Sequence, residues 1–451
     1  MLPPPARAIP PPRPARPVRP VSVPPAELGL LGRLLALRRE ELRPAAWAAA
    51  FHFFLFAAYY ILRPLRDEIG AEHRELVATA WSLVAVACLA LVPLYSWAGS
   101  RWPRRRFLPR VFRAFGLVVL AFYLLLRRRP ADGPGAPVEM AFYVWVSVFV
   151  MFAATVFWGL MADLFRPDQG RRMFGLLALG GSLGGITGPL LVGLLVEPIG
   201  ADNLLLLAVL LLEAALFCQR RTERAAAALG PVPPATAAPL PGGALDGIPA
   251  VFASPYLRRF AGYLLVFVFG SGFLYFFQLD LARGAFPDRV ERREFFALVD
   301  LAVNTSTLLV QFLVTGRLLG RIGVGWTLTL VPLLTAAGFL GLAAWPDLGL
   351  FVALYALRRT ANFALSRPAR ETLFTVVPRA HKYKAKAFLD TFVYRGGDVA
   401  TGWIYHGLAA LGLGAGGLCL VAAPVAAAGV VLARSLGRRL RAAENGPAGG
   451  A

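Results

Sequence analysis

The chain has 451 residues, of which 57% are hydrophobic and only 16% are charged, and its mean hydropathy is +0.60. Soluble domains carry roughly 25% charged residues, so this composition excludes a soluble domain and predicts a membrane protein. The charges are unbalanced, with 47 Lys and Arg against 26 Asp and Glu, a net charge of +21. The chain therefore either binds a polyanion or places its cations on one side of a bilayer.

Residues 1–44 precede the first long apolar run. Residues 1–26 are rich in proline and arginine, and we expect them to be disordered and solvated. Residues 28–41 read LGLLGRLLALRREE, which predicts a short amphipathic helix lying on the cytoplasmic headgroups. We therefore expect no membrane span in this part of the chain.

Twelve apolar segments follow, and each approaches the length of about 20 residues that a helix needs to cross a bilayer. They lie between charged or Pro/Gly-rich breaks, at approximately 45–62, 76–97, 108–126, 139–161, 173–196, 204–219, 259–278, 295–316, 324–343, 348–366, 387–411 and 416–434. The sixth is short, so a count of eleven stays open. The predicted fold class is all-α, a polytopic membrane protein with about twelve transmembrane helices.

A segment rich in Ala, Pro and Gly, residues 220–258, divides the spans into two sets of six. The predicted halves are residues 45–219 and 259–436, with a cytoplasmic tail at 437–451. Secondary transporters are commonly built from two such repeats with the substrate site between them. The pattern therefore favours a two-domain transporter of major-facilitator architecture that works by alternating access.

The distribution of basic residues predicts the orientation. With both termini cytoplasmic, the cytoplasmic segments hold 32 Lys and Arg, the opposite face holds 10, and five lie within spans. Cytoplasmic loops carry this excess, so we expect a multi-pass protein of a bacterial inner membrane. The net charge is then mostly a topology signal, and we expect the lipid bilayer as the partner, no nucleic acid, and a monomer.

Chemistry beyond transport has little support in the sequence. The cysteines (Cys88, Cys218 and Cys419) lie singly in apolar runs, and the four histidines show no ligand spacing. No nucleophile–base pair is evident. We therefore expect no enzyme activity, no cofactor and no metal site, although a membrane enzyme or flippase acting on lipid is a rival of another class.

The richest charged cluster ends the first span, where YYILRPLRDE places Arg63, Arg66, Asp67 and Glu68 together. Ionisable groups in or beside spans are functional candidates because burying them is costly. The cluster could bind an anion and accept a proton. The alternative is an interfacial cap in which Arg63 and Asp67 pair at i,i+4.

Two arginine pairs lie inside predicted spans. Arg358 and Arg359 lie in the tenth span, far from its cytoplasmic end, and arginine suits bidentate binding of phosphate or carboxylate. We expect at least one of them to face the cavity. Arg110 and Arg113 begin the third span, and snorkelling to the nearby interface is the favoured interpretation for them.

The segment 367–398 holds the three lysines of the chain at alternate positions, 382, 384 and 386, while the other 44 basic positions of the chain are arginine. A composition that defaults to arginine has kept Lys384 and Lys386, which favours a specific role. Asp390, Arg395 and Asp398 follow in the eleventh span. They are interpreted as an ion-paired switch or proton site, or else as a purely structural pair.

Two further features complete the candidates. Asp300 lies on one helix face with Asn304 and Gln311, and a cavity-lining face is favoured because lipid offers these groups no partner. Gly180, Gly184 and Gly188 have GxxxG spacing in the fifth span, which predicts close helix packing.

Several stretches resemble the ATP:ADP antiporter (nucleotide transporter) family, which is major-facilitator-like. They are YYILRPLRDEIG at 59–70, YVWVSVFVMFAATVFWGLMADLF at 143–165, RRMFG at 171–175, and RPARETLFTVVP with KYKAKAFLDTFVYRGGD within 367–398. The resemblance implies exchange of a nucleotide across the membrane. It extends over nearly all of the spans and excludes the tail.

Residue by residue, the resemblance implies roles for a few positions. Arg66 occupies the basic place of the family's first-helix motif and Asp67 follows it, while Lys384 and Lys386 match the lysines before the eleventh helix. Asp390 and Arg395 match the acid and base of that helix. The stretches 77–81 and 144–147 lack the lysine and the glutamate usual in nucleotide carriers, so another organic anion stays open as the substrate.

The expected function is thus exchange of a nucleotide or related organic anion, and the alternative is a proton-coupled carrier or exporter of an unrelated small molecule. The expected substrate-binding residues are Arg63, Arg66, Arg358, Arg359, Lys384, Lys386 and Arg395. The expected coupling residues are Asp67, Glu68, Asp300, Asp390 and Asp398.

Overall fold

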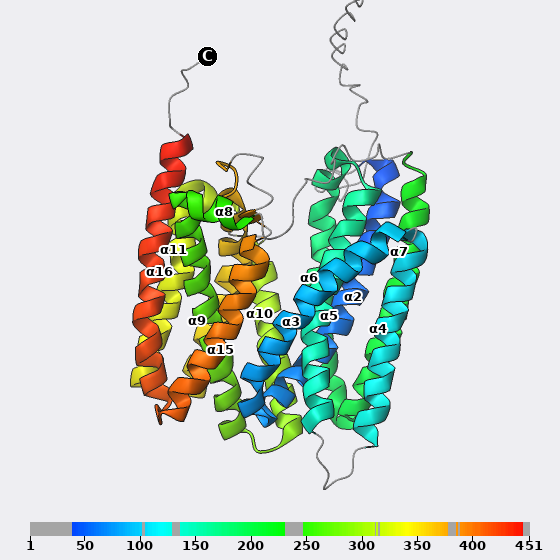
Figure 1. Cartoon of the computed structure of the whole chain (residues 1–451). Coiled ribbons are helices and arrows are strands. Elements are labelled where there is room, and N and C mark those ends of the chain that lie inside the picture. The colour runs from blue at the N-terminus through cyan, green and yellow to red at the C-terminus, as the bar shows by residue number, and fades with distance from the viewer. Residues whose placement is uncertain are drawn as a thin grey trace, which may run out of the picture.

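The computed structural model describes residues 38–101, 104–128, 136–230, 247–311, 313, 316–377, 385–386 and 388–444. These residues are almost entirely helical and contain no strand, which confirms the predicted all-α class. The helices form two bundles side by side (Figure 1). The first bundle contains α2 (Arg39–Glu72), η1 (Arg74–Leu76), α3 (Val77–Arg101), α4 (Arg104–Arg127), α5 (Ala136–Leu164), α6 (Pro167–Ile199) and α7 (Ala201–Ala227).

The second bundle holds another six long helical segments. Its elements are α8 (Gly247–Ala253), α9 (Pro255–Ala285), α10 (Arg289–Val310), α11 (Gly316–Ala344), α12 (Leu348–Ala361) with η4 (Asn362–Ser366) and α13 (Arg367–Thr372), η5 (Leu389–Val393) with α15 (Tyr394–Ala410), and α16 (Ala415–Glu444). Nine helices in the described part of the chain are long and apolar enough to cross a membrane. The predicted spans at 295–316, 348–366 and 387–411 correspond to the more polar or shorter α10, α12 and α15.

Three predicted boundaries need correction. Residues 39–44, placed before the first span and partly in the expected interfacial helix, are the first turns of α2. There, Glu41 accepts a hydrogen bond from the Arg38 backbone N–H at 3.0 Å, and its carboxylate pairs with Arg172 in α6. The predicted linker starts too early, since α7 continues to Ala227, and α8 lies near its end. The second half extends to Glu444. Hydropathy marks only the apolar part of a helix and misses such polar extensions.

Local sequence signals set several helix ends. Ser254, Asp288 and Asp347 each precede a helix and accept hydrogen bonds from backbone N–H groups of its first turn, at 3.3, 2.7 and 2.8 Å. Gly200 separates α6 from α7 with φ of 81°, a left-handed conformation that glycine adopts without strain.

Helices α2 and α6 pack with their backbones in close approach at the three glycines of the predicted packing motif. A Cβ at Gly180 or Gly184 would collide with the carbonyl oxygens of Ala49 or Phe53, and one at Gly188 would lie 2.6 Å from Tyr60 Cβ. The small residues therefore let the two helices form one compact pair.

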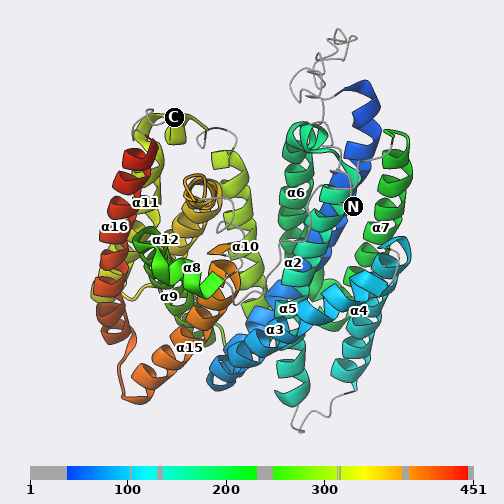
Figure 2. The ribbon, with the colours of Figure 1, turned by 45° about the horizontal axis from the view of Figure 1, so that its top comes forward.

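The two bundles lie apart at one end of the molecule and in contact at the other. We call the side where α2 begins and α16 ends the tail side, and the side where α2 and α9 end the closed side. The ribbons of the bundles diverge toward the tail side and meet at the closed side (Figures 1 and 2).

Candidate functional site

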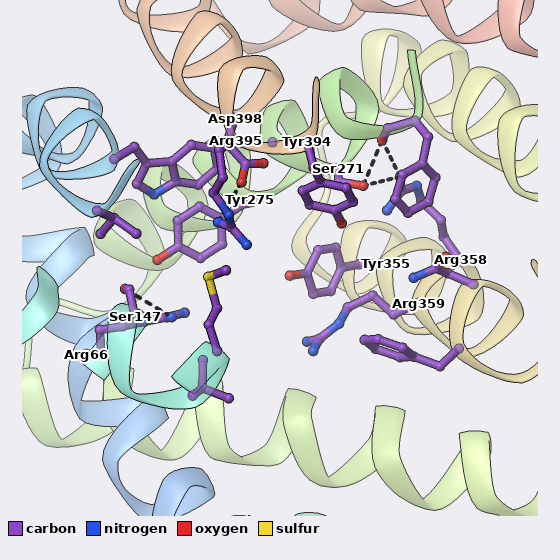
Figure 3. A pocket seen from close by; sticks show the side chains of 18 of the residues that line it. Arg66, Ser147, Ser271, Tyr275, Tyr355, Arg358, Arg359, Tyr394, Arg395 and Asp398 are labelled. Atoms are coloured by element: carbon purple, nitrogen blue, oxygen red, sulfur yellow. Dashed lines mark hydrogen bonds and ion pairs between the residues drawn. The ribbon is translucent and has the colours of Figure 1, made fainter. Parts of the chain in front are cut away.

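A cavity with a volume of about 310 Å³ lies between the two halves. The first half contributes residues of α2, α3 and α5, and the second half contributes residues of α9, α12, η4 and α15 (Figure 3). Its charged lining consists of Arg66, Arg358, Arg359, Arg395 and Asp398. The structure thus brings five of the sequence-predicted residues, from both halves, to one cavity.

Arg66 faces the cavity from α2 and is held by neighbours on two helices. Its Nε donates to Asp67 Oδ1 at 2.9 Å, and its Nη1 reaches Ser147 Oγ at 3.4 Å. Asp67 is buried beneath it and also accepts from the hydroxyl of Tyr275 in the second half at 2.9 Å. Asp67 therefore orients Arg66 and links the halves, behind the cavity wall.

Arg358 is buried in α12 and its partners are all neutral. Its Nε donates to Thr335 Oγ1 at 2.7 Å, and its Nη2 donates to Ser271 Oγ at 2.7 Å and to the Phe267 carbonyl at 3.4 Å. Within the described residues no carboxylate lies in ion-pair contact with it. A buried guanidinium without a counter-ion is costly, so this cation is available to an anion in the cavity.

Arg359, the next residue, has a carboxylate partner. Its Nη1 donates to Asp300 Oδ1 at 2.9 Å, and Arg63 Nη1 of the first half approaches the same oxygen at 3.0 Å. The other oxygen, Oδ2, is buried without a hydrogen-bond partner among the described residues. Asp300 therefore joins a cavity arginine to a contact between the halves. Arg63 also lies 3.5 Å from Asp67, the i,i+4 pair of the alternative interpretation, and it does not line the cavity.

Arg395 and Asp398 form an ion pair of 2.8 Å on α15 at the cavity wall (Figure 3). Asp390, which the sequence grouped with them, is exposed and belongs to η5, not to the cavity. Asp390 does not reach the cavity because it lies one to two turns closer to the tail side than Arg395. The predicted three-residue switch is thus a two-residue pair.

Aromatic side chains that the sequence interpretation did not single out form a wall of the cavity. The Trp81 indole N–H donates to Tyr143 at 2.9 Å, and the Tyr143 and Tyr275 hydroxyls are 2.9 Å apart. Trp81 stacks on Tyr275 with ring centroids 5.5 Å apart. Aromatic residues are common in every span, so no sequence signal distinguished these three.

Below the cavity, an arginine and glutamate cluster joins α2 to the start of α10. Glu68 is buried and lies within ion-pair distance of Arg289 at 2.6 Å, Arg293 at 3.1 Å and Arg292 at 3.7 Å. Arg289 also contacts Glu139 of α5 at 2.9 Å. We call these five residues the closed-side network. Glu68 therefore holds the halves together at the closed side and does not line the cavity.

Further polar contacts surround this network, and the one between Arg74 and Asp280 joins the two halves. Arg74 contacts Asp280 at 2.8 Å, and Tyr405 donates to the same carboxylate at 2.7 Å. His73 lies 2.5 Å from Glu139, while burial and then the charge of Arg289 lower the pKa of the imidazole. A neutral His73 can donate one N–H to this glutamate. The sequence analysis did not single out the arginines at the start of α10.

The remaining predicted residues lie elsewhere. Lys386 pairs with Glu371 at 2.5 Å toward the tail side and does not line the cavity. Lys384 lies outside the described residues. Among the residues that the structure describes, no group of three His, Cys, Asp or Glu side chains could hold a metal ion.

Helices of membrane-spanning length, in two halves around a polar cavity, define a membrane transporter. Residues 42–397 match the family model described as the Major Facilitator Superfamily, and the chain belongs to this family. The predicted major-facilitator architecture is therefore confirmed. No curated protein matches the sequence.

Solved transporter structures share the fold. A point mutant of the nucleoside transporter NupG is 14% identical, with a TM-score of 0.61 over 89% of this chain and 100% of that one. A POT family transporter in complex with 5-aminolevulinic acid is 10% identical, with a TM-score of 0.62 over 88% and 96%. A bacterial homologue of the lysosomal transporter Spinster, in an inward-facing and unoccupied conformation, is 14% identical, with a TM-score of 0.51 over 90% and 97%.

Proposed function

We propose that this protein exchanges an organic anion carrying an aromatic ring, such as a nucleotide, across a bacterial inner membrane by alternating access. The observation that carries the proposal is Arg358, a buried cavity arginine whose partners are all neutral. Phosphate and carboxylate groups are the natural partners of such a guanidinium.

The charge balance of the cavity supports an anionic substrate. The charged lining residues, their carboxylate partners Asp67 and Asp300, and Arg63, which pairs with both of these aspartates, comprise five arginines and three aspartates. Within the described residues this is an excess of two positive charges. An excess cation in a low-dielectric site favours binding of an opposite charge. A substrate with about two negative charges would balance this excess.

The aromatic wall supports a ring in the substrate. The Trp81–Tyr275 stack lines the same cavity as the arginines, and Tyr355 lies opposite, beside Arg359 (Figure 3). Stacking a base on an aromatic side chain contributes about 1–3 kcal/mol. A phosphate on the arginines and a base on this wall together describe a nucleotide, in agreement with the sequence resemblance.

The shared carboxylate of Asp300 suggests how loading is coupled to movement. The contact between Arg63 and Asp300 joins the halves and must break if the closed side opens. An anion in the cavity competes with Asp300 for Arg359, which disrupts this shared arrangement. The empty carrier therefore stays closed on this side, and we expect exchange rather than net transport.

The orientation in this proposal follows the distribution of basic residues, with the tail side cytoplasmic. The structure is then closed on the side away from the cytoplasm, and the cavity exchanges substrate with the cytoplasm. The next step of the cycle requires the closed-side network to separate.

Proteoliposomes loaded with labelled ATP test the proposal. We expect external ADP to drive label efflux, and other nucleotides to compete better than nucleosides or dipeptides. R358Q should abolish exchange. The control variant R438Q, which replaces an exposed arginine of α16, should exchange as the wild type does. Absence of exchange with every anion offered, together with a proton-driven flux of a neutral solute, would establish the proton-coupled alternative instead.

A further inference from the structure

A second pocket lies on the outer side of the first half, at the tail-side ends of α4 and α7, and its volume is about 590 Å³. Four arginines dominate its lining, two from each helix, with one glutamate. The complete lining is Pro109, Arg110, Arg113, Arg220, Glu223, Arg224 and Ala227. Figure 2 shows α4 and α7 on the side of the first half that faces away from α9 and α16.

The spacing of the arginines places each pair on one helix face. Arg110 and Arg113 are three residues apart on α4, and Arg220 and Arg224 are four apart on α7, so each pair projects from one side of its helix. The two faces border the same pocket. Four guanidinium groups thus converge from two helices.

These four arginines face the pocket without an ion-pair partner among the described residues. All four side chains are exposed, and in the described part of the chain none of them has a carboxylate in ion-pair contact. Glu223 is the one acid of the pocket, and it accepts a hydrogen bond from Gln219 at 2.7 Å. The pocket therefore keeps a formal charge of +3 from its lining.

The position of the pocket indicates which anion it meets. It lies near the tail-side ends of two membrane-length helices, where phospholipid headgroups contact the protein. Its lining contains no aromatic side chain that could stack a base, and it lies outside the interface between the halves, so alternation of the halves would not carry a ligand across. Both facts distinguish it from the central cavity.

We propose that this pocket binds the phosphate of an anionic phospholipid headgroup, with the α4 pair and the α7 pair of arginines holding it bidentately. Basic pockets between membrane helices on the cytoplasmic side bind such headgroups. The proposal does not depend on the identity of the transported substrate. A bound headgroup would clamp the tail-side ends of α4 and α7 together.

The test measures lipid retention by the purified full chain in detergent, using native mass spectrometry with added phosphatidylglycerol or phosphatidylcholine. We expect retention of phosphatidylglycerol only. R113Q/R220Q should weaken its apparent affinity about 30-fold, at about 1 kcal/mol per arginine. The matched control R438Q/R439Q removes two exposed arginines of α16 near the same side and should change it less than 3-fold.

Three results would overturn the assignment. Equal losses in the two double variants would show a general surface-charge effect. Retention of phosphatidylcholine as strong as that of phosphatidylglycerol would show that the net negative charge of the headgroup does not determine binding. Displacement of the lipid by millimolar inorganic phosphate would assign the pocket to a free anion.

Should R113Q/R220Q fail to fold, E223Q offers the opposite change in charge. It should tighten the binding of phosphatidylglycerol, and unchanged or weaker binding would contradict the proposal.

Discussion

The central cavity and the closed-side network both combine arginines from several helices, but they use them in opposite ways. In the network, the three arginines of the second half share Glu68, and Glu139 and Glu72 also pair with Arg289 and Arg292, so three carboxylates match three arginines. In the cavity, Arg358 bonds only to hydroxyl and carbonyl oxygens. Arginines matched by carboxylates stabilise one conformation, and an unmatched arginine is left for a ligand.

The largest expected effect on substrate affinity comes from removing the unmatched positive charge of Arg358. R358Q should lower the affinity for an anionic substrate about 100-fold, because charge-assisted hydrogen bonds contribute about 1.5–3 kcal/mol each. Equilibrium binding of a radiolabelled nucleotide measures this. R358K keeps the positive charge but loses the two-pronged geometry of the guanidinium, so its substrate affinity should lie between those of R358Q and the wild type. Equal affinity in R358Q and the wild type would contradict the role of Arg358.

The second test breaks the matched region. E68Q leaves Arg293 without its carboxylate and should destabilise the closed-side contact by about 3 kcal/mol. The halves should then separate more often at that side. Spin labels at E75C and R283C, an exposed pair 3.6 Å apart across the halves, report this as a longer distance between the labels.

A matched variant gives the control for that measurement. E72Q removes a half-exposed partner of Arg292 and should shift the distance distribution much less than E68Q. Identical distributions in E68Q and the wild type would show that the network does not hold the closed side together.

The third test concerns the residue that connects the two regions. D300N removes the charge that Arg63 and Arg359 share, so the empty carrier should cross between conformations more easily. We expect net efflux without external substrate to rise about 10-fold relative to exchange, a change of about 1.4 kcal/mol. Efflux from proteoliposomes with and without external ADP measures it. If D300N showed no more net efflux than the wild type, the pairing of Asp300 with Arg63 and Arg359 would not be what holds the empty carrier closed.

A smaller effect is expected at the aromatic wall. Y275F removes the hydroxyl that donates to Asp67 and contacts Tyr143, which should reduce substrate affinity about 5-fold, or about 1 kcal/mol. Y263F, whose hydroxyl bonds to Leu328 and Ser366 in the core of the second half, is the control. It should lower thermal stability without changing affinity.

The smallest effects separate the two lysines that the sequence resemblance paired. K386A removes a partly exposed ion pair with Glu371, which is worth about 1 kcal/mol or less, and should leave substrate affinity unchanged. K384A should still weaken binding, as its place in the motif predicts. Direct binding measurements on both variants compare them, and unchanged affinity in K384A removes Lys384 from the site.

The fold was predictable because it rests on patterns along the chain. Apolar runs and basic loops predicted the helices and halves, while polar helix ends such as the continuation of α7 to Ala227 were invisible to hydropathy. The costly burial of charge pointed to Arg358 and Arg359, and both of them line the cavity. The chain pattern could not show which buried arginine had a carboxylate partner, since Asp300 reaches Arg359 from a different helix.

The closed-side network was unpredictable for a related reason. Arg289, Arg292 and Arg293 lie at the start of a helix that follows a loop, a place where basic residues are usually solvated. Only the arrangement of the two halves brings them onto Glu68. Partners supplied by distant helices leave no spacing signal in the sequence.

The two π-helical segments, η4 and η5, adjoin the cavity at the places where Arg359 and Arg395 enter it. A π turn contains one extra residue compared with an α turn, and restoring α geometry would rotate the helix beyond it by about 100°. Asn362 and Phe363 of η4 line the cavity themselves. A change of η4 from π to α geometry would therefore turn side chains of the cavity wall while the long helices of either bundle stayed straight.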